Sequence, residues 1–140
     1  MPTTDHGRDH ESLGEEECLR LLATTRIGRV AYTEAALPAI QPVTYTLGDG
    51  AVEIPTRTGS ALAVAVRGAV VAFEADSYND IARAGWNVTV IGPSWVVAAG
   101  PSEDPDVCLV VVQLGVIRGW RTTLSMRATD TTKLADDAPA

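Results

Sequence analysis

Residues 39–56 read AIQPVTYTLGDGAVEIPT, and this stretch decides the fold class. Two segments with many β-branched residues, 39–47 and 51–56, flank the triplet Gly48-Asp49-Gly50. Glycine and aspartate accept the positive φ angles that tight hairpin turns require. The stretch therefore predicts two antiparallel strands joined by a tight turn.

The same pattern of apolar and β-branched residues recurs outside this hairpin. It predicts four more strands, at 28–33, 69–75, 86–99 and 107–116, with 117–124 as an extension of the last. Gly92-Pro93 predicts a bulge or bend inside the long strand, because proline donates no ladder hydrogen bond. Segment 76–85 is polar, and we expect it to be a connection between strands.

Two short helices are expected beside these strands. Ser12 and Glu15 form a capping-box pattern that predicts a helix ending near Thr24. Alanine and leucine favour a second helix at 61–67, which Gly68 should end. Six strands joined mainly by turns, without alternating helices, predict a mainly β fold: a six-stranded antiparallel β-barrel with short helices.

One domain accounts for the chain. It has 140 residues, 46% of them apolar, which is enough for a single core without disulfides. Residues 1–11 and 128–140 are polar and lack periodicity, so both are predicted to be flexible tails around a domain at 12–127. Cys18 and Cys108 are isolated in the sequence and are interpreted as small buried apolar residues.

Charge and composition exclude several classes of function. The formal charge is -7 and there is no basic stripe, so nucleic acid is not expected as a partner. The longest apolar runs, 61–66 and 109–112, are too short to cross a membrane. The first ten residues lack the apolar core of a secretory signal, so we expect a cytoplasmic protein.

The two histidines, His6 and His10, lie in the predicted N-terminal tail. No third ligand accompanies them, so no metal site is predicted. The predicted domain then lacks a histidine base for a Ser-His-Asp or Cys-His nucleophile, which argues against hydrolases of those kinds.

Thr56-Arg57-Thr58-Gly59-Ser60 is the segment most suggestive of binding chemistry. It lies between a predicted strand and a predicted helix. The N–H groups at a helix start, the hydroxyls and the guanidinium together suit a phosphate. A simpler interpretation is a serine or threonine helix cap beside a solvated arginine. The residues alone leave both interpretations open.

Several short motifs follow one another over residues 13–121. They are Leu13 to Cys18, Gly28-Arg29-Val30-Ala31-Tyr32, Pro42-Val43-Thr44-Tyr45, Gly59-Ser60-Ala61-Leu62 and Gly85-Trp86-Asn87-Val88. In this order the chain resembles the pyridoxamine 5'-phosphate oxidase-like family. The resemblance implies a six-stranded antiparallel split β-barrel that forms a homodimer. It also implies a flavin, usually FMN and in some relatives a deazaflavin, in a cleft shared by the two subunits.

The resemblance assigns roles to three groups of residues. The backbone lining the flavin ring would come from Pro42, Val43, Thr44 and Tyr45. The phosphate would be held by Thr56, Arg57, Thr58 and Ser60. A C-terminal aromatic and basic pair near the cleft would be Trp120 and Arg121. Ala61 departs from the family pattern, because many relatives carry a lysine or arginine there.

The function that the resemblance implies is an FMN-dependent oxidoreductase acting on an unknown small molecule. Arg121 would orient an anionic substrate, and Tyr45 would donate a hydrogen bond near the ring. Two alternatives stay open: a deazaflavin-dependent reductase, or a non-catalytic split-barrel binding protein that has lost its flavin.

Overall fold

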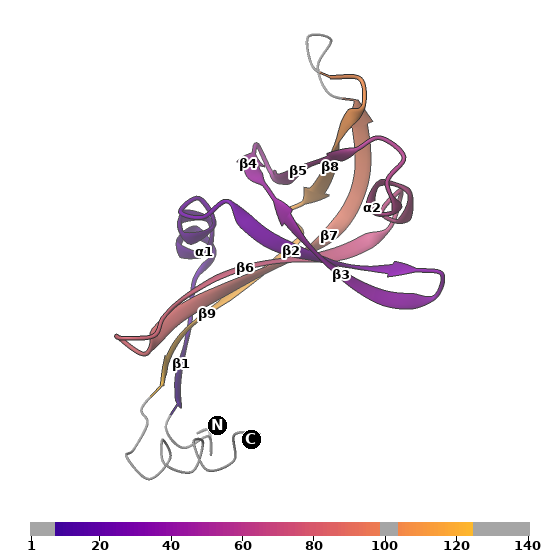
Figure 1. The fold of residues 1–140 in the computed structure, drawn as a ribbon. Helices are drawn as coiled ribbons and strands as arrows, with labels where there is room; N and C mark the ends of the chain where they lie inside the picture. Colours follow the sequence, from indigo (N-terminus) through magenta and orange to yellow (C-terminus); the bar gives the residue numbers. More distant parts are fainter. Residues whose placement is uncertain (1–7, 99–103, 125–140) are drawn as a thin grey trace.

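The fold is mainly β, as the sequence predicts, and all of its strand pairs are antiparallel (Figure 1). The computed structural model describes residues 8–98 and 104–124. In chain order the elements are β1 (Arg8–Ser12), α1 (Glu15–Leu22), β2 (Ile27–Glu34), β3 (Leu37–Thr44), β4 (Thr46–Gly48), β5 (Ala51–Arg57), α2 (Ala61–Ala65), β6 (Val70–Asn79), β7 (Ala84–Ala98), β8 (Val107–Gln113) and β9 (Val116–Leu124).

The strand β7 joins the two halves of the sheet. Its residues 84–93 pair with β6, whereas Ser94 to Ala98 pair with β8. The strand order is β3-β2-β6-β7-β8-β5-β4, and β9 pairs with β7 and with β1. β7 therefore runs on through Gly92-Pro93, where a bulge or bend was predicted, and changes partner there. Because β3 and β4 stand at the two ends of this order, the barrel is not closed, and the fold is a split barrel.

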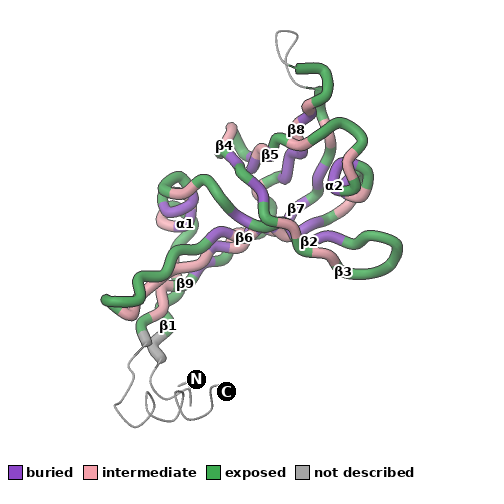
Figure 2. Tube along the Cα trace, viewed as in Figure 1, coloured by how far each residue is buried: buried purple, intermediate pink, exposed green. Residues whose placement is uncertain are grey.

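Alternate residues of the central strands, among them β2, β5, β6 and β7, fill the barrel interior, which both helices help to close (Figure 2). Val30, Phe73 and Val90 are fully buried at the centre of neighbouring strands. Leu22 of α1 and Leu62 of α2 are buried in the same core. The side chains between these inward positions lie on the opposite face, called here the outer face of the sheet.

The described residues form nine strands, more than the six predicted. Tyr45 separates β3 from β4, and Leu114-Gly115 separates β8 from β9, so two predicted strands are divided. A Cβ at Gly115 would lie 2.6 Å from the Ile91 carbonyl oxygen, so only glycine allows this close approach.

The third additional strand, β1, occupies the part of the chain that was expected to be a flexible tail. Residues 8–12 pair with β9, and Ser12 lies opposite Trp120. Backbone pairing needs no apolar side chain, so hydrophobic patterning gave no signal for it. The rest of the predicted N-terminal tail, residues 1–7, and the predicted C-terminal tail, residues 128–140, lie outside the described residues.

Two local predictions were wrong. The helix α1 begins after Gly14 without a side-chain cap, because Ser12 belongs to β1 and forms no capping box. Segment 76–85 is not simply a polar connection, since β6 runs to Asn79 and β7 begins at Ala84 in one long hairpin. Within the described part of the chain, no helix is long and apolar enough to cross a membrane.

Candidate functional site

The strand β3 has one edge that no other strand in the described part of the chain covers, because β3 pairs only with β2. The Tyr45 N–H donates to the Arg26 carbonyl oxygen at 3.0 Å, on the β2 side. Backbone groups alternate in direction along an antiparallel strand, so the N–H and C=O of Thr44 point to the open edge. Pro38 and Pro42 occupy the same alternating positions, where a missing N–H costs no ladder bond.

The segment predicted to line a flavin ring therefore contributes backbone groups and exposed side chains at this edge. Pro42 and Thr44 are exposed, whereas Val43 and Tyr45 point into the core and are buried. The open edge is the one place in the segment where a planar ligand can meet unpaired backbone donors and acceptors.

Tyr45 does not fit its predicted role as a hydrogen-bond donor near the ring. Its hydroxyl donates to the Leu22 carbonyl oxygen at 2.6 Å, and its ring packs edge-on against Phe73 with 4.7 Å between centroids. Burial raises the pKa of Tyr45 to about 12. The side chain anchors α1 to the core, and its hydroxyl is not directed at the open edge.

The second predicted segment, here called the phosphate turn (residues 56–60), links β5 to α2. Ser60 Oγ accepts a hydrogen bond from the Ala63 N–H at 3.1 Å and lies 3.1 Å from Thr56 Oγ1. Thr58 Oγ1 donates to the Pro105 carbonyl oxygen at 3.2 Å. Each hydroxyl already has a partner in the chain, and Ser60 makes the helix cap that the simpler interpretation expects.

Backbone donors remain available at this turn. In the region that the structure describes, no acceptor faces the N–H groups of Gly59, Ala61 and Leu62. Successive N–H groups in a turn attract an anion. An anion bound here would therefore be held mainly by the backbone.

Arg57 lies on the other side of the strand from Thr56, because side chains alternate along β5. Its side chain is exposed, and none of the carboxylates that the structure describes pairs with it. The guanidinium would have to bend over the end of β5 to meet a phosphate held at the turn. The structure thus places Arg57 beside the predicted phosphate site but does not aim it there.

The phosphate turn leads into α2, which lies beside the tip of the β2–β3 hairpin. The helix α2 packs on β2, and Ala61 and Val64 lie beside the hairpin tip at Thr33. Pro42 and Thr44 pair with β2 residues that lie roughly 13 to 20 Å from Thr33 along the strand, at about 3.3 Å per residue.

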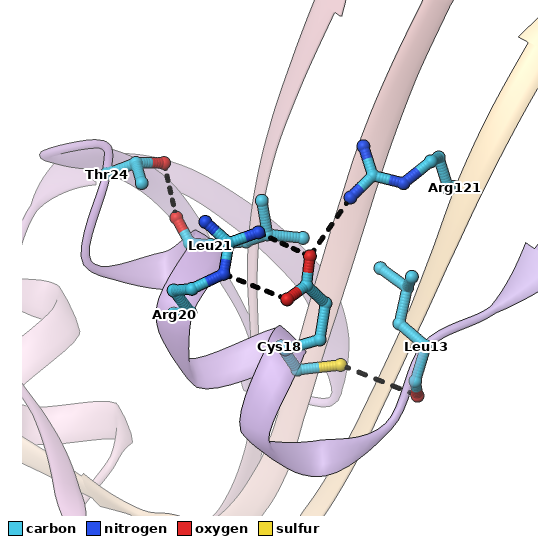
Figure 3. A network of polar contacts seen from close by, with 7 residues as sticks. Leu13, Cys18, Arg20, Leu21, Thr24 and Arg121 are labelled. Atoms are coloured by element: carbon cyan, nitrogen blue, oxygen red, sulfur yellow. Dashed lines mark hydrogen bonds and ion pairs between the residues drawn. The ribbon is translucent and has the colours of Figure 1, made fainter.

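Trp120 and Arg121, the third predicted group, lie on β9, away from both segments (Figure 1). Arg121 Nη2 donates to Glu17 Oε1 at 3.1 Å, which ties the strand to α1 (Figure 3). Hydrogen bonding by Arg20, and more weakly the charge of Arg121, lowers the pKa of Glu17. Within one chain, Arg121 is occupied by this ion pair and does not reach the open edge.

Sequence reasoning missed an ion-pair cluster on the outer face. Arg29 Nη1 donates to Glu74 Oε1 at 3.0 Å and to Asp76 Oδ2 at 3.3 Å. Burial, and then the neighbouring Asp76 carboxylate, raise the pKa of Glu74 to about 7, although Arg29 partly opposes this. The sequence contains a signal that could have predicted this cluster. A charged residue stands at position 29 and another at position 74, inside otherwise apolar strands.

No group of three metal-ligating side chains occurs in the described ranges of the chain. The sheet of this chain is antiparallel and open, both helices pack against its core, and one edge strand is uncovered. These features place the chain in the class of split-barrel proteins.

Comparison with known proteins agrees with this class. The sequence profile of the family described as pyridoxamine 5'-phosphate oxidase matches residues 14–137, so the chain belongs to that family. An uncharacterised protein of Mycobacterium tuberculosis is 46% identical over 90 residues, which cover 61% of this chain and 59% of that protein's length.

Two solved structures share the fold. An FAD-binding protein of Mycobacterium smegmatis has a TM-score of 0.69 and 27% identity, covering 81% of this chain and 98% of its own. An FAD-binding protein of Mesorhizobium loti has a TM-score of 0.72 at 16% identity, covering 84% and 99%.

Proposed function

We propose that this protein is a flavin-dependent oxidoreductase that acts on a small molecule. The observation that carries the proposal is the open edge of β3, where the Thr44 N–H and C=O face outward at the position that the family uses for the flavin ring. The FAD-binding relative of Mycobacterium smegmatis supports the same class of cofactor. The identity of the flavin and of the substrate, and a cytoplasmic location, stay predictions from the sequence.

The residues present fit a flavin at this place. The edge of β3 would bind the ring through Thr44, and the phosphate turn would hold the phosphate through its free N–H groups. Bound flavin would supply hydride or electron transfer, while the chain binds it, orients it and sets its electrostatic surroundings. No side chain of this chain is required as an acid or base in that arrangement.

We also propose that the outer face binds a second copy of the chain. A row of directly opposed apolar side chains crosses five strands of this face: Ile40, Ala31, Ala72, Ile91 and Val116. Ile40 is 72% exposed and Val116 is 46% exposed, although both are apolar. A self-complementary two-fold contact would cover this row, and Arg118 beside it could face the carboxylates of the other copy.

The shared cleft gives the second copy a part in the site. Within one chain, Trp120 is exposed on the outer face of β9 and does not reach the open edge of β3. A two-fold partner would bring another β9 to this face, which is how Trp120 would approach the flavin, whereas Arg121 points to the side of α1 and pairs there with Glu17.

A second candidate function is a flavin-binding protein without catalysis. The specific observation that favours it is that both groups expected to face a substrate are engaged elsewhere. The Tyr45 hydroxyl bonds to α1, and the Arg121 guanidinium pairs with Glu17.

The test is to purify the protein without added cofactor and record its visible spectrum and the mass of any released ligand. A flavin spectrum and a flavin mass, or stoichiometric uptake of flavin on titration, are expected. Reduction by a nicotinamide donor, with return of the spectrum when an electron acceptor is added, would separate the oxidoreductase from the binding protein. A deazaflavin mass, or no uptake of any flavin, would contradict the proposal.

A further inference from the structure

A hollow of about 260 Å³ lies where β6, β7 and β9 run side by side, near the turn of the long β6–β7 hairpin (Figure 1). Five of its lining residues occupy the outer positions of these strands: Asp76, Tyr78, Gly85, Asn87 and Thr122. The inward neighbours Ala75 and Val88 are fully buried, so the hollow belongs to the outer face. Its volume is just below the roughly 300–1,000 Å³ of drug-sized sites, which suits a ligand with a single ring.

A glycine makes room for the hollow. Gly85 lies between Tyr78 and Thr122 in the ladder of paired residues. A Cβ at this position would lie 2.8 Å from Cδ2 of Tyr78, so the tyrosine ring leans over the glycine and forms an aromatic wall. Trp120 lies directly opposite Asn87 on β9 and adds a second ring on the same face. The hollow therefore offers a flat apolar surface beside polar groups.

The polar groups of the hollow include both donors and acceptors of hydrogen bonds. The Asp76 carboxylate only accepts, whereas the Asn87 amide and the hydroxyls of Tyr78 and Thr122 both donate and accept. Among the residues that the structure describes, neither the Tyr78 hydroxyl nor the Asn87 amide has a hydrogen-bond partner. Both groups are therefore available to a ligand.

The charges at the hollow favour a neutral ligand. Arg29 Nη1 donates to Asp76 Oδ2 at 3.3 Å and also to Glu74 Oε1 at 3.0 Å. A cationic ligand at Asp76 would meet this guanidinium, and an anionic ligand would meet the carboxylates and the net charge of -7. A neutral ligand with several hydroxyls meets neither repulsion, and each hydroxyl can pair with donors and acceptors alike.

We propose that this hollow binds a neutral monosaccharide ring. A pyranose carries hydroxyls at its edge, which would pair with Asp76 and Asn87, and an apolar C–H face, which would pack on the Tyr78 ring. Tyr78 lies six residues from Ala72, or about 20 Å along β6, so the hollow lies well away from the apolar row assigned to the second copy. The site involves no residue of the flavin site and goes beyond the function proposed above.

The test is an NMR titration of the purified full chain with the methyl glycosides of glucose, galactose and mannose. At least one of them should shift the backbone N–H of Gly85 and the side-chain amide of Asn87, with a dissociation constant of about 1–10 mM. Glycerol carries hydroxyls but has no ring face, and it should bind at least about tenfold more weakly.

Two variants of the hollow and one matched control sharpen the test. Asp76→Asn should weaken glycoside binding about tenfold, because a hydroxyl bonds more strongly to a carboxylate than to an amide. Tyr78→Leu removes the ring face and should weaken binding about threefold to fivefold. Asp80→Asn makes the same change as the first variant in the β6–β7 turn, outside the lining of the hollow, and should leave binding unchanged.

Three outcomes would overturn the monosaccharide site. The first is that none of the three glycosides shifts Gly85 or Asn87 at concentrations up to about 100 mM. The second is unchanged glycoside binding in both Asp76→Asn and Tyr78→Leu, with both variants folded, since the sugar would then bind elsewhere. The third is tighter binding of benzylammonium than of any glycoside at these residues, which would make the hollow a cation site.

Discussion

The inner and outer faces of the same strands differ in how their apolar side chains are covered. On β6, Phe73 faces inward and is fully buried, whereas Val70 on the outer face is 70% exposed. The inner face is sealed by α1, α2 and the other half of the sheet. The outer face keeps apolar residues that the described part of the chain does not cover. One chain alone covers the apolar residues of the inner face. We propose that a second copy of the chain covers those of the outer face.

The largest effect is expected on the inner face. Phe73→Ala removes a fully buried ring that packs against Tyr45, and it should lower the free energy of unfolding by about 3–5 kcal/mol. Urea denaturation measures this loss. Phe73→Leu keeps most of the buried volume and should cost clearly less, and equal losses for both variants would contradict the packing described for this face.

A smaller effect on unfolding and a larger one on association are expected on the outer face. Val116→Asp places a charge in the apolar row, and in the proposed two-fold dimer that charge would occur twice in the interface. The dimer dissociation constant should rise about 100-fold, measured by sedimentation equilibrium. Ile81→Asp, at an exposed turn outside the outer face, is the control and should leave the dimer unchanged. A dimer that is unaffected by Val116→Asp would place the interface elsewhere.

The smallest effect concerns the charge cluster on the outer face. The pKa of Glu74 is raised to about 7 in the folded chain, so the folded state holds a proton that the unfolded state releases nearer its ordinary value of 4.5. Stability from this group is present below the ordinary value and is lost as the pH rises through about 7.

The free energy of unfolding should therefore fall by about 1 kcal/mol between pH 5 and pH 8, after allowance for the half-exposed site. Glu74→Gln imitates the protonated carboxyl and should make this slope flatter, while the contributions of other groups cancel in the comparison. Identical pH profiles of the parent and the variant in thermal unfolding would show that Glu74 does not titrate in this range.

Much of the fold follows from local sequence signals. The turn Gly48-Asp49-Gly50 and the segments around it predict the β4–β5 hairpin, since Gly50 adopts a φ of 74° there. The strand β1 could not be predicted in this way, because its stability comes from pairing with β9, more than a hundred residues away. The capping-box prediction at Ser12 was wrong for the same reason. Ser12 belongs to a strand that pairs with β9, and it does not cap α1.

For the candidate site, the sequence predicted which strand its residues lie on better than it predicted where their side chains point. The sequence placed Pro42 to Tyr45 on a strand, and the two prolines of β3 mark the edge that faces away from β2. It did not show that Tyr45 points inward or that Arg57 and Thr56 lie on opposite faces of β5. Those outcomes depend on register, which tertiary packing sets and local composition does not.

We propose that the open edge of β3 holds a flavin through the backbone of Thr44. The most direct measurement is the flavin affinity of Thr44→Pro compared with Thr44→Ala. Proline removes the outward N–H at a position where an edge strand tolerates it, whereas alanine keeps the N–H and changes only the side chain. We predict about a tenfold loss for Thr44→Pro, with little change for Thr44→Ala, from one hydrogen bond of about 1–1.5 kcal/mol. Equal flavin affinity in the two variants, with both folded, would contradict the claim.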